Sequence, residues 1–155
     1  MFNPLSRLTL LIKLFSWWKI PLLAYVRPSV VELSDSVAVV RLKLGRRSKN
    51  HANSMYFGAL AMGAELSIAV SAVSEMASNK KFTNLLFKRF ECEFLRRADG
   101  DTYFVCTQPS EVKALLEQCR RTHERVEGIF QGFAYVDQKT KEPVMKYQLT
   151  LSFKS

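Results

Sequence analysis

One stretch of the sequence constrains the fold more than any other, because residues 54–77 consist mainly of small and aliphatic residues. Glu65 is the only charged residue between Ser54 and Ser74. This composition predicts a helix from about Ser54 to Ala77, with Asn53 or Ser54 as its cap. A helix that is apolar on every side is stable only when it is buried on every side. The rest of the chain must therefore wrap around it.

Five further segments alternate apolar and polar residues with the period of two that is typical of strands. In chain order they cover residues 37–44, 86–94, 102–108, 125–136 and 144–154. A short helix is expected over residues 110–122, with turns over residues 98–101 and 137–143. The order is strand, buried helix, then four strands with one helical insertion. An antiparallel five-stranded sheet wrapped around one long central helix satisfies this α+β pattern, and that is the hotdog arrangement, although the pattern alone also allows other α+β arrangements.

The length of 155 residues suits a single domain, and we therefore expect one site. The 23 Lys and Arg residues outnumber the 14 Asp and Glu residues, which gives a formal charge of +9. This excess favours anionic partners: nucleic acid, an acidic membrane surface or phosphorylated ligands such as coenzyme A. The basic residues are scattered in pairs, without a long basic run or an aromatic-basic motif, so we expect no nucleic-acid binding.

The three cysteines, Cys92, Cys106 and Cys119, are odd in number and show no C-x-x-C spacing. Only two histidines, His51 and His123, could join them as metal ligands. This pattern predicts buried free thiols in a reducing, cytoplasmic compartment and no structural zinc or other metal.

The first 26 residues are strongly apolar but are interrupted by Arg7, Lys13 and Lys19. No run approaches the roughly 20 apolar residues of a membrane span, and no small-x-small cleavage site follows, so neither a span nor a signal peptide is expected. We divide the chain into an N-terminal amphipathic helical segment, residues 1–26, and a hotdog domain, residues 27–155. The apolar stripe of the expected helix consists of Leu5, Leu8, Leu11, Ile12, Phe15 and Trp18.

Two placements of this N-terminal helix remain open. It could pack on the domain, over the substrate channel, or lie in a membrane interface. Trp17, Trp18 and the basic residues favour the interfacial placement. We favour the packed helix, and keep peripheral membrane contact through residues 1–26 as the alternative.

Two motifs carry a resemblance to a known family. Residues 50–65, N-H-A-N-S-M-Y-F-G-A-L-A-M-G-A-E, resemble the loop-and-helix signature of the hotdog acyl-CoA thioesterases, and most closely the phenylacetic-acid-degradation type, N-x-x-x-x-x-H-G-G-x-L-x-x-L-A-D. Residues 88–101, K-R-F-E-C-E-F-L-R-R-A-D-G-D, resemble the strand and turn that follow the helix in small bacterial members. The resemblance covers about residues 28–154. It implies a homodimer or a dimer of dimers, an acyl-CoA or acyl carrier protein substrate, and no cofactor beyond the coenzyme A of that substrate.

The family motif can be carried over position by position. Asn50 matches the Asn of the pattern, Tyr56 stands where the His is expected, Phe57 and Gly58 match the Gly pair, and Glu65 matches the catalytic acid. Tyr in place of His changes the group that contacts the thioester. Phe in place of the first Gly narrows the approach to the helix N-terminus.

The backbone N–H groups of Phe57 and Gly58 would lack partners at the positive end of the helix dipole, and could polarise a thioester carbonyl. Glu65 lies eight residues further on, about 12 Å along the helix axis. Both cannot act on one carbonyl within one subunit. We therefore expect a site shared between two subunits, in which Glu65 acts as a general base on water or attacks the thioester directly. The alternative for Glu65 is a helix residue that reaches solvent or pairs with a basic side chain.

The remaining candidates have weaker signals. Asn50 either orients the water or forms a turn, His51 belongs to the loop or pocket, Ser54 caps the helix, and Tyr56 lines the acyl pocket or donates to the thioester. The candidates for contact with the phosphates of coenzyme A are Arg46, Arg47, Arg89, Arg96 and Arg97. The competing function is a hotdog protein that binds acyl-CoA without cleaving it. A hydratase is less favoured, because its Asp-His or Glu-His pair has no counterpart at His51.

Overall fold

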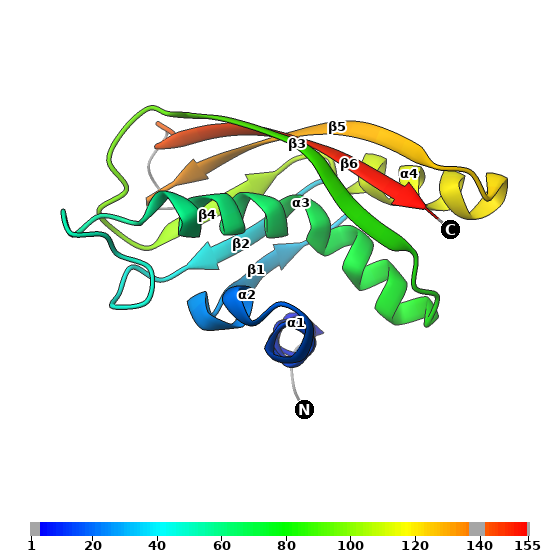
Figure 1. The fold of residues 1–155 in the computed structure, drawn as a ribbon, viewed down its shortest axis with the longest axis horizontal. Coiled ribbons are helices and arrows are strands. Elements are labelled where there is room, and N and C mark those ends of the chain that lie inside the picture. Colours follow the sequence, from blue (N-terminus) through cyan, green and yellow to red (C-terminus); the bar gives the residue numbers. More distant parts are fainter. Residues whose placement is uncertain (1–3, 137–141, 155) are drawn as a thin grey trace.

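The computed structural model describes residues 4–136 and 142–154 (Figure 1). Its elements in chain order are α1 (Pro4–Lys19), α2 (Pro21–Val26), β1 (Ser29–Leu33), β2 (Ala38–Leu42), α3 (Phe57–Asn79), β3 (Asn84–Phe94), β4 (Thr102–Cys106), α4 (Pro109–Thr122), β5 (Val126–Tyr135) and β6 (Met145–Lys154). The predicted α+β class is confirmed.

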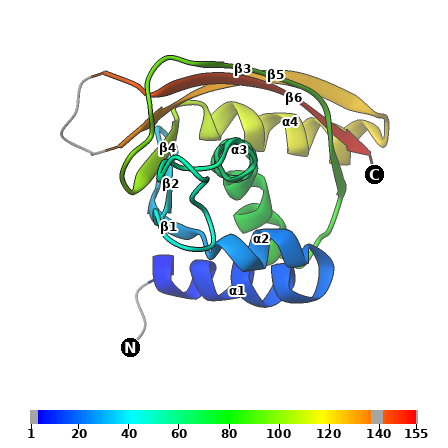
Figure 2. The same ribbon diagram turned by 60° about the vertical axis from the view of Figure 1, so that its left-hand side comes forward.

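The strands form one sheet in the order β1-β2-β4-β5-β6-β3, and every neighbouring pair is antiparallel. The sheet curls around α3, while α4 packs against both α3 and β5 (Figures 1 and 2). The ladder between β3 and β6 runs the length of both strands and contains one irregularity, between Phe87 and Arg89. The predicted hotdog arrangement, a sheet wrapped around one long central helix, is therefore confirmed.

The central helix α3 is buried along most of its length, as its composition predicts. Ala64, Ile68, Val70 and Ala72 are completely inaccessible to solvent. Among the described residues, α3 is the one helix long and apolar enough to suit a membrane span. Because the sheet encloses most of it, its apolar surface is satisfied by the protein core instead.

The sheet has six strands where five were predicted. The additional strand, β1, pairs antiparallel with β2 and forms one edge of the sheet. It has only five residues and begins directly after Pro28, so it is too short to show a clear alternation. Its stability comes from pairing with β2 and from contact with α1.

The start of α3 also differs from the prediction, because the helix begins at Phe57 and its N-cap is Tyr56. No side chain caps the helix, so the predicted capping by Asn53 or Ser54 is wrong. The reason is a set of hydrogen bonds between distant parts of the chain. The N–H of Met55 donates to the carbonyl of Ala98 at 2.7 Å, and the N–H of Tyr56 donates to the carbonyl of Ser48 at 2.7 Å, which keeps these residues extended.

The other predicted elements are present with small shifts. The short helix expected over residues 110–122 is α4, and the last two strands are β5 and β6. Residues 137–141 of the turn predicted over 137–143 lie outside the described part of the chain. Cys106 and Cys119 are buried free thiols, as predicted, but Cys92 is exposed because it lies on β3 at the edge of the sheet.

The two N-terminal helices form an outer layer beside β1, away from the top of the curled sheet (Figure 2). One stripe of α1 faces the protein: Leu8, Ile12 and Ser16 are buried, and the Thr9 hydroxyl accepts a hydrogen bond from the N–H of Val30 at 3.1 Å. The predicted stripe is therefore only partly correct. Leu8 and Ile12 are buried and Leu5 is partly buried, but Leu11 and Trp18 face solvent, and the side chain of Phe15 is outside the described structure.

Candidate functional site at the start of the central helix

The loop that leads into α3 is organised by Asn50. Its side-chain oxygen accepts hydrogen bonds from the N–H of Ala52 at 2.9 Å, and from the N–H and hydroxyl of Ser54 at 3.2 and 3.3 Å. Its own N–H donates to the carbonyl of Ser54 at 2.8 Å. Asn50 therefore serves as a turn residue here, Ser54 is buried beneath the loop, and His51 is exposed on it.

The first turn of α3 presents two free backbone donors. The N–H groups of Ala59 and Leu60 both donate to the carbonyl of Tyr56, at 2.9 and 3.1 Å. The N–H groups of Phe57 and Gly58 make no hydrogen bond with any other described residue. They lie at the positive end of a 23-residue helix, a position suited to binding an oxyanion or a carbonyl oxygen.

Two aromatic side chains flank these donors. The rings of Tyr56 and Phe57 lie 4.7 Å apart, and both side chains are substantially exposed. A Cβ on Gly58 would come within 2.7 Å of the Tyr56 ring, so the ring rests against the glycine. The glycine therefore gives the Tyr56 ring its place beside the helix start.

Glu65 lies on the less buried side of α3. Gly58, Ala61 and Met62 share this partly buried stripe, with the spacing of successive helix turns. Burial raises the pKa of the Glu65 carboxyl above its ordinary value. Within the described ranges, the carboxyl makes no hydrogen bond or ion pair. A partly desolvated carboxylate without a protein partner is a candidate general base or nucleophile.

The distance between the free N–H groups and Glu65 agrees with the distance expected from the sequence. Eight residues separate Phe57 from Glu65 in one continuous helix, which is about 12 Å along the axis. One carbonyl group cannot contact both within a single subunit.

A second loop, residues 95–101, lies against the start of α3 and contains Arg96 and Arg97. The carboxylate of Asp101 accepts from the N–H of Leu44 at 2.9 Å, and residues 95–101 therefore pack beside residues 43–56. Arg97, Arg46 and Arg47 make no ion pair with any described residue. Both loops that adjoin the start of α3 therefore carry arginines.

Two of the predicted phosphate-binding residues are engaged elsewhere. Arg96 forms an ion pair with Glu142, and Arg89 pairs with Glu91 on β3. Arg89 lies along the edge strand, away from the two loops. Arg46 and Arg97 therefore lie on the two loops beside the helix start without an ion pair to any described residue. Arg96 is paired with Glu142, and the Arg47 guanidinium lies over the Tyr25 ring of α2.

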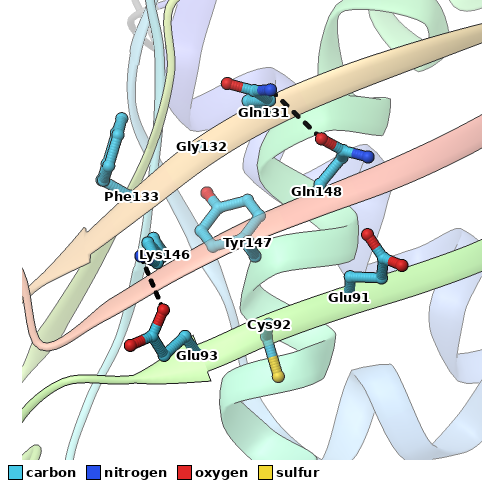
Figure 3. Close-up of a pocket in the computed structure, with 9 residues that line it drawn as sticks. All are labelled: Glu91, Cys92, Glu93, Gln131, Gly132, Phe133, Lys146, Tyr147 and Gln148. Carbon is cyan, nitrogen blue, oxygen red and sulfur yellow. Dashed lines mark hydrogen bonds and ion pairs between the residues drawn. The ribbon is translucent and has the colours of Figure 1, made fainter.

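A hollow of about 340 Å³ lies on the outer face of the sheet (Figure 3). Its polar groups are largely satisfied by one another: Gln131 donates to Gln148 at 3.1 Å, and Lys146 pairs with Glu93 at 2.6 Å. No predicted site residue lines this hollow, and the sheet separates it from α3. The unpartnered carboxylate and the free amides at α3 are better suited to chemistry than this hollow.

The edge strand β3 has a feature that the sequence pattern did not reveal. Phe90, Cys92 and Phe94 stand opposite Leu149, Tyr147 and Met145, which are buried on the inner face of the sheet. The three β3 residues point to the same face but are exposed. Beyond β3 no further strand pairs with it in the described chain. An 11-residue strand with an open edge and exposed aromatic side chains is a surface suited to pairing with another chain.

The described residues contain no cluster of three or more His, Cys, Asp or Glu side chains that could hold a metal ion.

Comparisons with known proteins agree with this architecture. The model of a family described as "Domain of unknown function (DUF4442)" matches residues 9–152. No curated protein matches the chain in sequence. Similar solved structures include a protein of unknown function from Chlorobaculum tepidum TLS, with a TM-score of 0.80, 12% identity and 97% coverage of both chains. A candidate thioesterase from Shewanella oneidensis has a TM-score of 0.79 at 9% identity, with 97% of this chain and 99% of that chain covered.

A thioesterase from Haemophilus influenzae has a TM-score of 0.65 at 10% identity, with 99% of this chain and 92% of that chain covered. Two of these three neighbours are described as thioesterases, and the similarity confirms the fold that the resemblance in the sequence implied. The resemblance to the phenylacetic-acid-degradation branch stays a prediction. At these identities the similarity establishes the fold alone.

Proposed function

Because the chain belongs to the family described as "Domain of unknown function (DUF4442)" and shares its fold with thioesterases, we propose that it hydrolyses the thioester of an acyl-CoA or an acyl carrier protein. One observation carries this proposal: a single helix presents two free N–H groups at its start and a partly buried, unpartnered Glu65 further along. These are the two components that thioester hydrolysis requires, an oxyanion site and a base or nucleophile.

The separation of these components supports a dimer as the active form. The open edge of β3 offers backbone groups for antiparallel pairing with the same strand of a second copy, related by a two-fold axis. Phe90 and Phe94 would be covered in this arrangement, and the free amides of one subunit could face Glu65 of the other. The dimer could act alone or as half of a dimer of dimers.

In the proposed reaction, Glu65 of one subunit takes a proton from water while the water oxygen bonds to the thioester carbonyl carbon. The carbonyl oxygen gains the negative charge, and the N–H groups of Phe57 and Gly58 of the partner subunit donate hydrogen bonds to it. The C–S bond then breaks, and the leaving thiolate takes the proton from Glu65. A raised pKa makes Glu65 a stronger base than an exposed glutamate.

The loops beside the helix start suit an anionic leaving group. Arg46 and Arg97 make no ion pair with any described residue and could contact the phosphates of coenzyme A. The pantetheine arm of coenzyme A would then run from these arginines to the amides that hold the carbonyl oxygen. The acyl chain would then extend past Tyr56 and Phe57, whose rings are exposed at this point.

The decisive experiment compares the wild-type protein with a Glu65→Gln variant in a free-thiol assay over a panel of acyl-CoA substrates. Gln keeps the size of the side chain but removes its basicity, so we expect the rate to fall by about 10² to 10⁴-fold. Glu75→Gln is a matched control, since Glu75 lies on the same helix and accepts a hydrogen bond from Asn79. Equal rates for the wild type and the Glu65 variant would show that Glu65 is not the catalytic residue.

A non-catalytic acyl-CoA binding protein is the second candidate. The observation that favours it is the Tyr56 and Phe57 ring pair, which partly covers the approach to the helix start. Calorimetric titration with acyl-CoA would detect binding, and the thiol assay would detect cleavage. Binding without thiol release from any substrate of the panel would identify this second function.

A further inference from the structure

The outward side of the two N-terminal helices is unusually apolar. Eight of the seventeen large hydrophobic side chains exposed in the described chain lie between residues 10 and 25. We call this surface the N-terminal apolar face. It consists of Leu10, Leu11, Leu14, Trp17, Trp18, Ile20, Leu22 and Tyr25. Trp17 and Trp18 are 79% and 78% exposed, so the two largest side chains of this face are almost fully in solvent.

The geometry of α1 explains why this face stays outside. Leu8, Ile12 and Ser16, spaced by four residues, form the stripe that packs on the protein. Leu10 and Leu14 lie on the opposite side of the same helix and are exposed. One apolar stripe of α1 therefore packs on the domain, and a second apolar stripe faces solvent. A helix that only packs on a soluble domain needs the first stripe alone.

The charges around this face all have one sign. The sequence has no acidic residue before Glu32, whereas Arg7, Lys13, Lys19 and Arg27 lie within the two helices or directly after them. The Lys19 ammonium lies 4.5 Å from the centre of the Trp18 ring. Basic side chains therefore lie at the margin of the N-terminal apolar face.

A second cation–aromatic contact involves an arginine of the loop before α3. The Arg47 guanidinium lies 5.4 Å from the centre of the Tyr25 ring. An apolar, Trp-containing surface with a basic margin is complementary to a bilayer whose headgroups are anionic. A second copy of the same face would not be complementary, because a two-fold contact would oppose Lys13 and Lys19 to like charges with no carboxylate between them.

We propose that α1 and α2 dock the protein on the surface of a membrane that contains anionic lipids. The axis of α1 lies parallel to the bilayer, Trp17 and Trp18 enter the interface between headgroups and acyl chains, and Lys13 and Lys19 contact lipid phosphates. Docking requires no unfolding, since Leu8 and Ile12 stay packed on the domain. The face includes no residue of β3, so it is compatible with the proposed dimer.

The sequence provides a direct probe of this docking. Trp17 and Trp18 are the only two tryptophans of the chain, and both belong to the N-terminal apolar face. Intrinsic tryptophan fluorescence therefore reports on this face alone. We expect a blue shift and protection from acrylamide quenching when the protein binds vesicles of phosphatidylcholine with phosphatidylglycerol. Phosphatidylcholine alone should give a much weaker effect, and added salt should reverse part of the binding.

Vesicle flotation then measures the contribution of each group. Trp17→Ala combined with Trp18→Ala should weaken binding by roughly tenfold or more, since apolar burial drives interfacial binding. Lys13→Gln combined with Lys19→Gln should weaken it by about fivefold for each cation lost. Ile129→Ala is the matched control, because Ile129 is 59% exposed on the outer face of the sheet and should not affect binding.

The proposal is overturned if the wild type neither floats with anionic vesicles nor shows the blue shift. It is also overturned if the double Trp variant floats as well as the wild type. A third contrary result would be a loss of self-association in this variant, measured by sedimentation without vesicles, since the face would then be a contact between copies. Vesicle binding is measured without a thioester, and thiol release without vesicles, so this inference and the proposed function can fail separately.

Discussion

The packing of α3 against β4 leads to a test of how tightly the central helix is held. Gly63 lies in the first half of α3 and faces Phe104 of β4, which is completely buried. A Cβ at position 63 would lie 2.5 Å from the Cδ2 atom of the Phe104 ring, and closer still to two further ring carbons. In a Gly63→Ala variant, either the ring or the helix must move.

The net effect follows from two opposing contributions. Forcing an additional carbon into a packed core costs about 1–3 kcal/mol, and the overlap with three ring atoms points to the upper part of this range. Replacing Gly by Ala inside a helix gains about 1 kcal/mol. We therefore expect Gly63→Ala to lower the free energy of unfolding by about 1–2 kcal/mol, a noticeable share of the roughly 5–15 kcal/mol typical of a domain.

Gly58→Ala is the matched comparison in the same helix. Its Cβ would meet only the Tyr56 ring, at 2.7 Å, and that side chain is exposed and can rotate away. The variant should therefore be as stable as the wild type or more stable by up to about 1 kcal/mol. Urea unfolding followed by far-UV circular dichroism would measure both. If Gly63→Ala proved as stable as Gly58→Ala, the inferred close packing of α3 on Phe104 would be wrong.

Three further predictions concern other parts of the molecule. Since burial raises the pKa of Glu65 above its unfolded value, the wild type should gain stability as the pH falls through the folded pKa towards the unfolded one, and Glu65→Gln should lose this component in urea unfolding at several pH values. Phe90→Lys should shift the proposed dimer towards monomer in sedimentation velocity, and an unchanged dimer would exclude β3 from the interface. Tyr147→Phe should lower stability by about 1 kcal/mol in thermal unfolding, because the buried Ser67 hydroxyl loses its 2.7 Å hydrogen bond with the Tyr147 hydroxyl.

The central helix could be predicted because its signal is local. Only one charged residue interrupts the apolar stretch, and such a helix is not stable when it is exposed to water. The start of the helix could not be predicted, because it depends on hydrogen bonds from Met55 to Ala98 and from Tyr56 to Ser48. Such bonds join segments whose proximity exists only in the folded chain.

The candidate site likewise has one part that can be predicted from the sequence and another that depends on the folded chain. Glu65 stands out in the sequence as a lone carboxylate, and the free amides at the start of α3 follow from helix geometry alone. The contact between the loop that carries Arg97 and the loop that carries Arg46 depends on hydrogen bonds between distant segments and has no local signal. Nor does alternation distinguish an edge strand from a central one, so the exposure of Phe90 on β3 was not foreseen.

The pairing of β3 with β6 has a consequence for the synthesis of the protein. β3 follows α3 directly in the chain, but its only partner in the described sheet is β6, the last strand in chain order. On the ribosome, β3 and the apolar helix before it must therefore wait until β4, α4, β5 and finally β6 have been made before the sheet can close over them. During this interval an 11-residue strand with exposed aromatic residues has no intramolecular partner. We expect the nascent chain to depend on chaperones over this interval more than its small size would suggest.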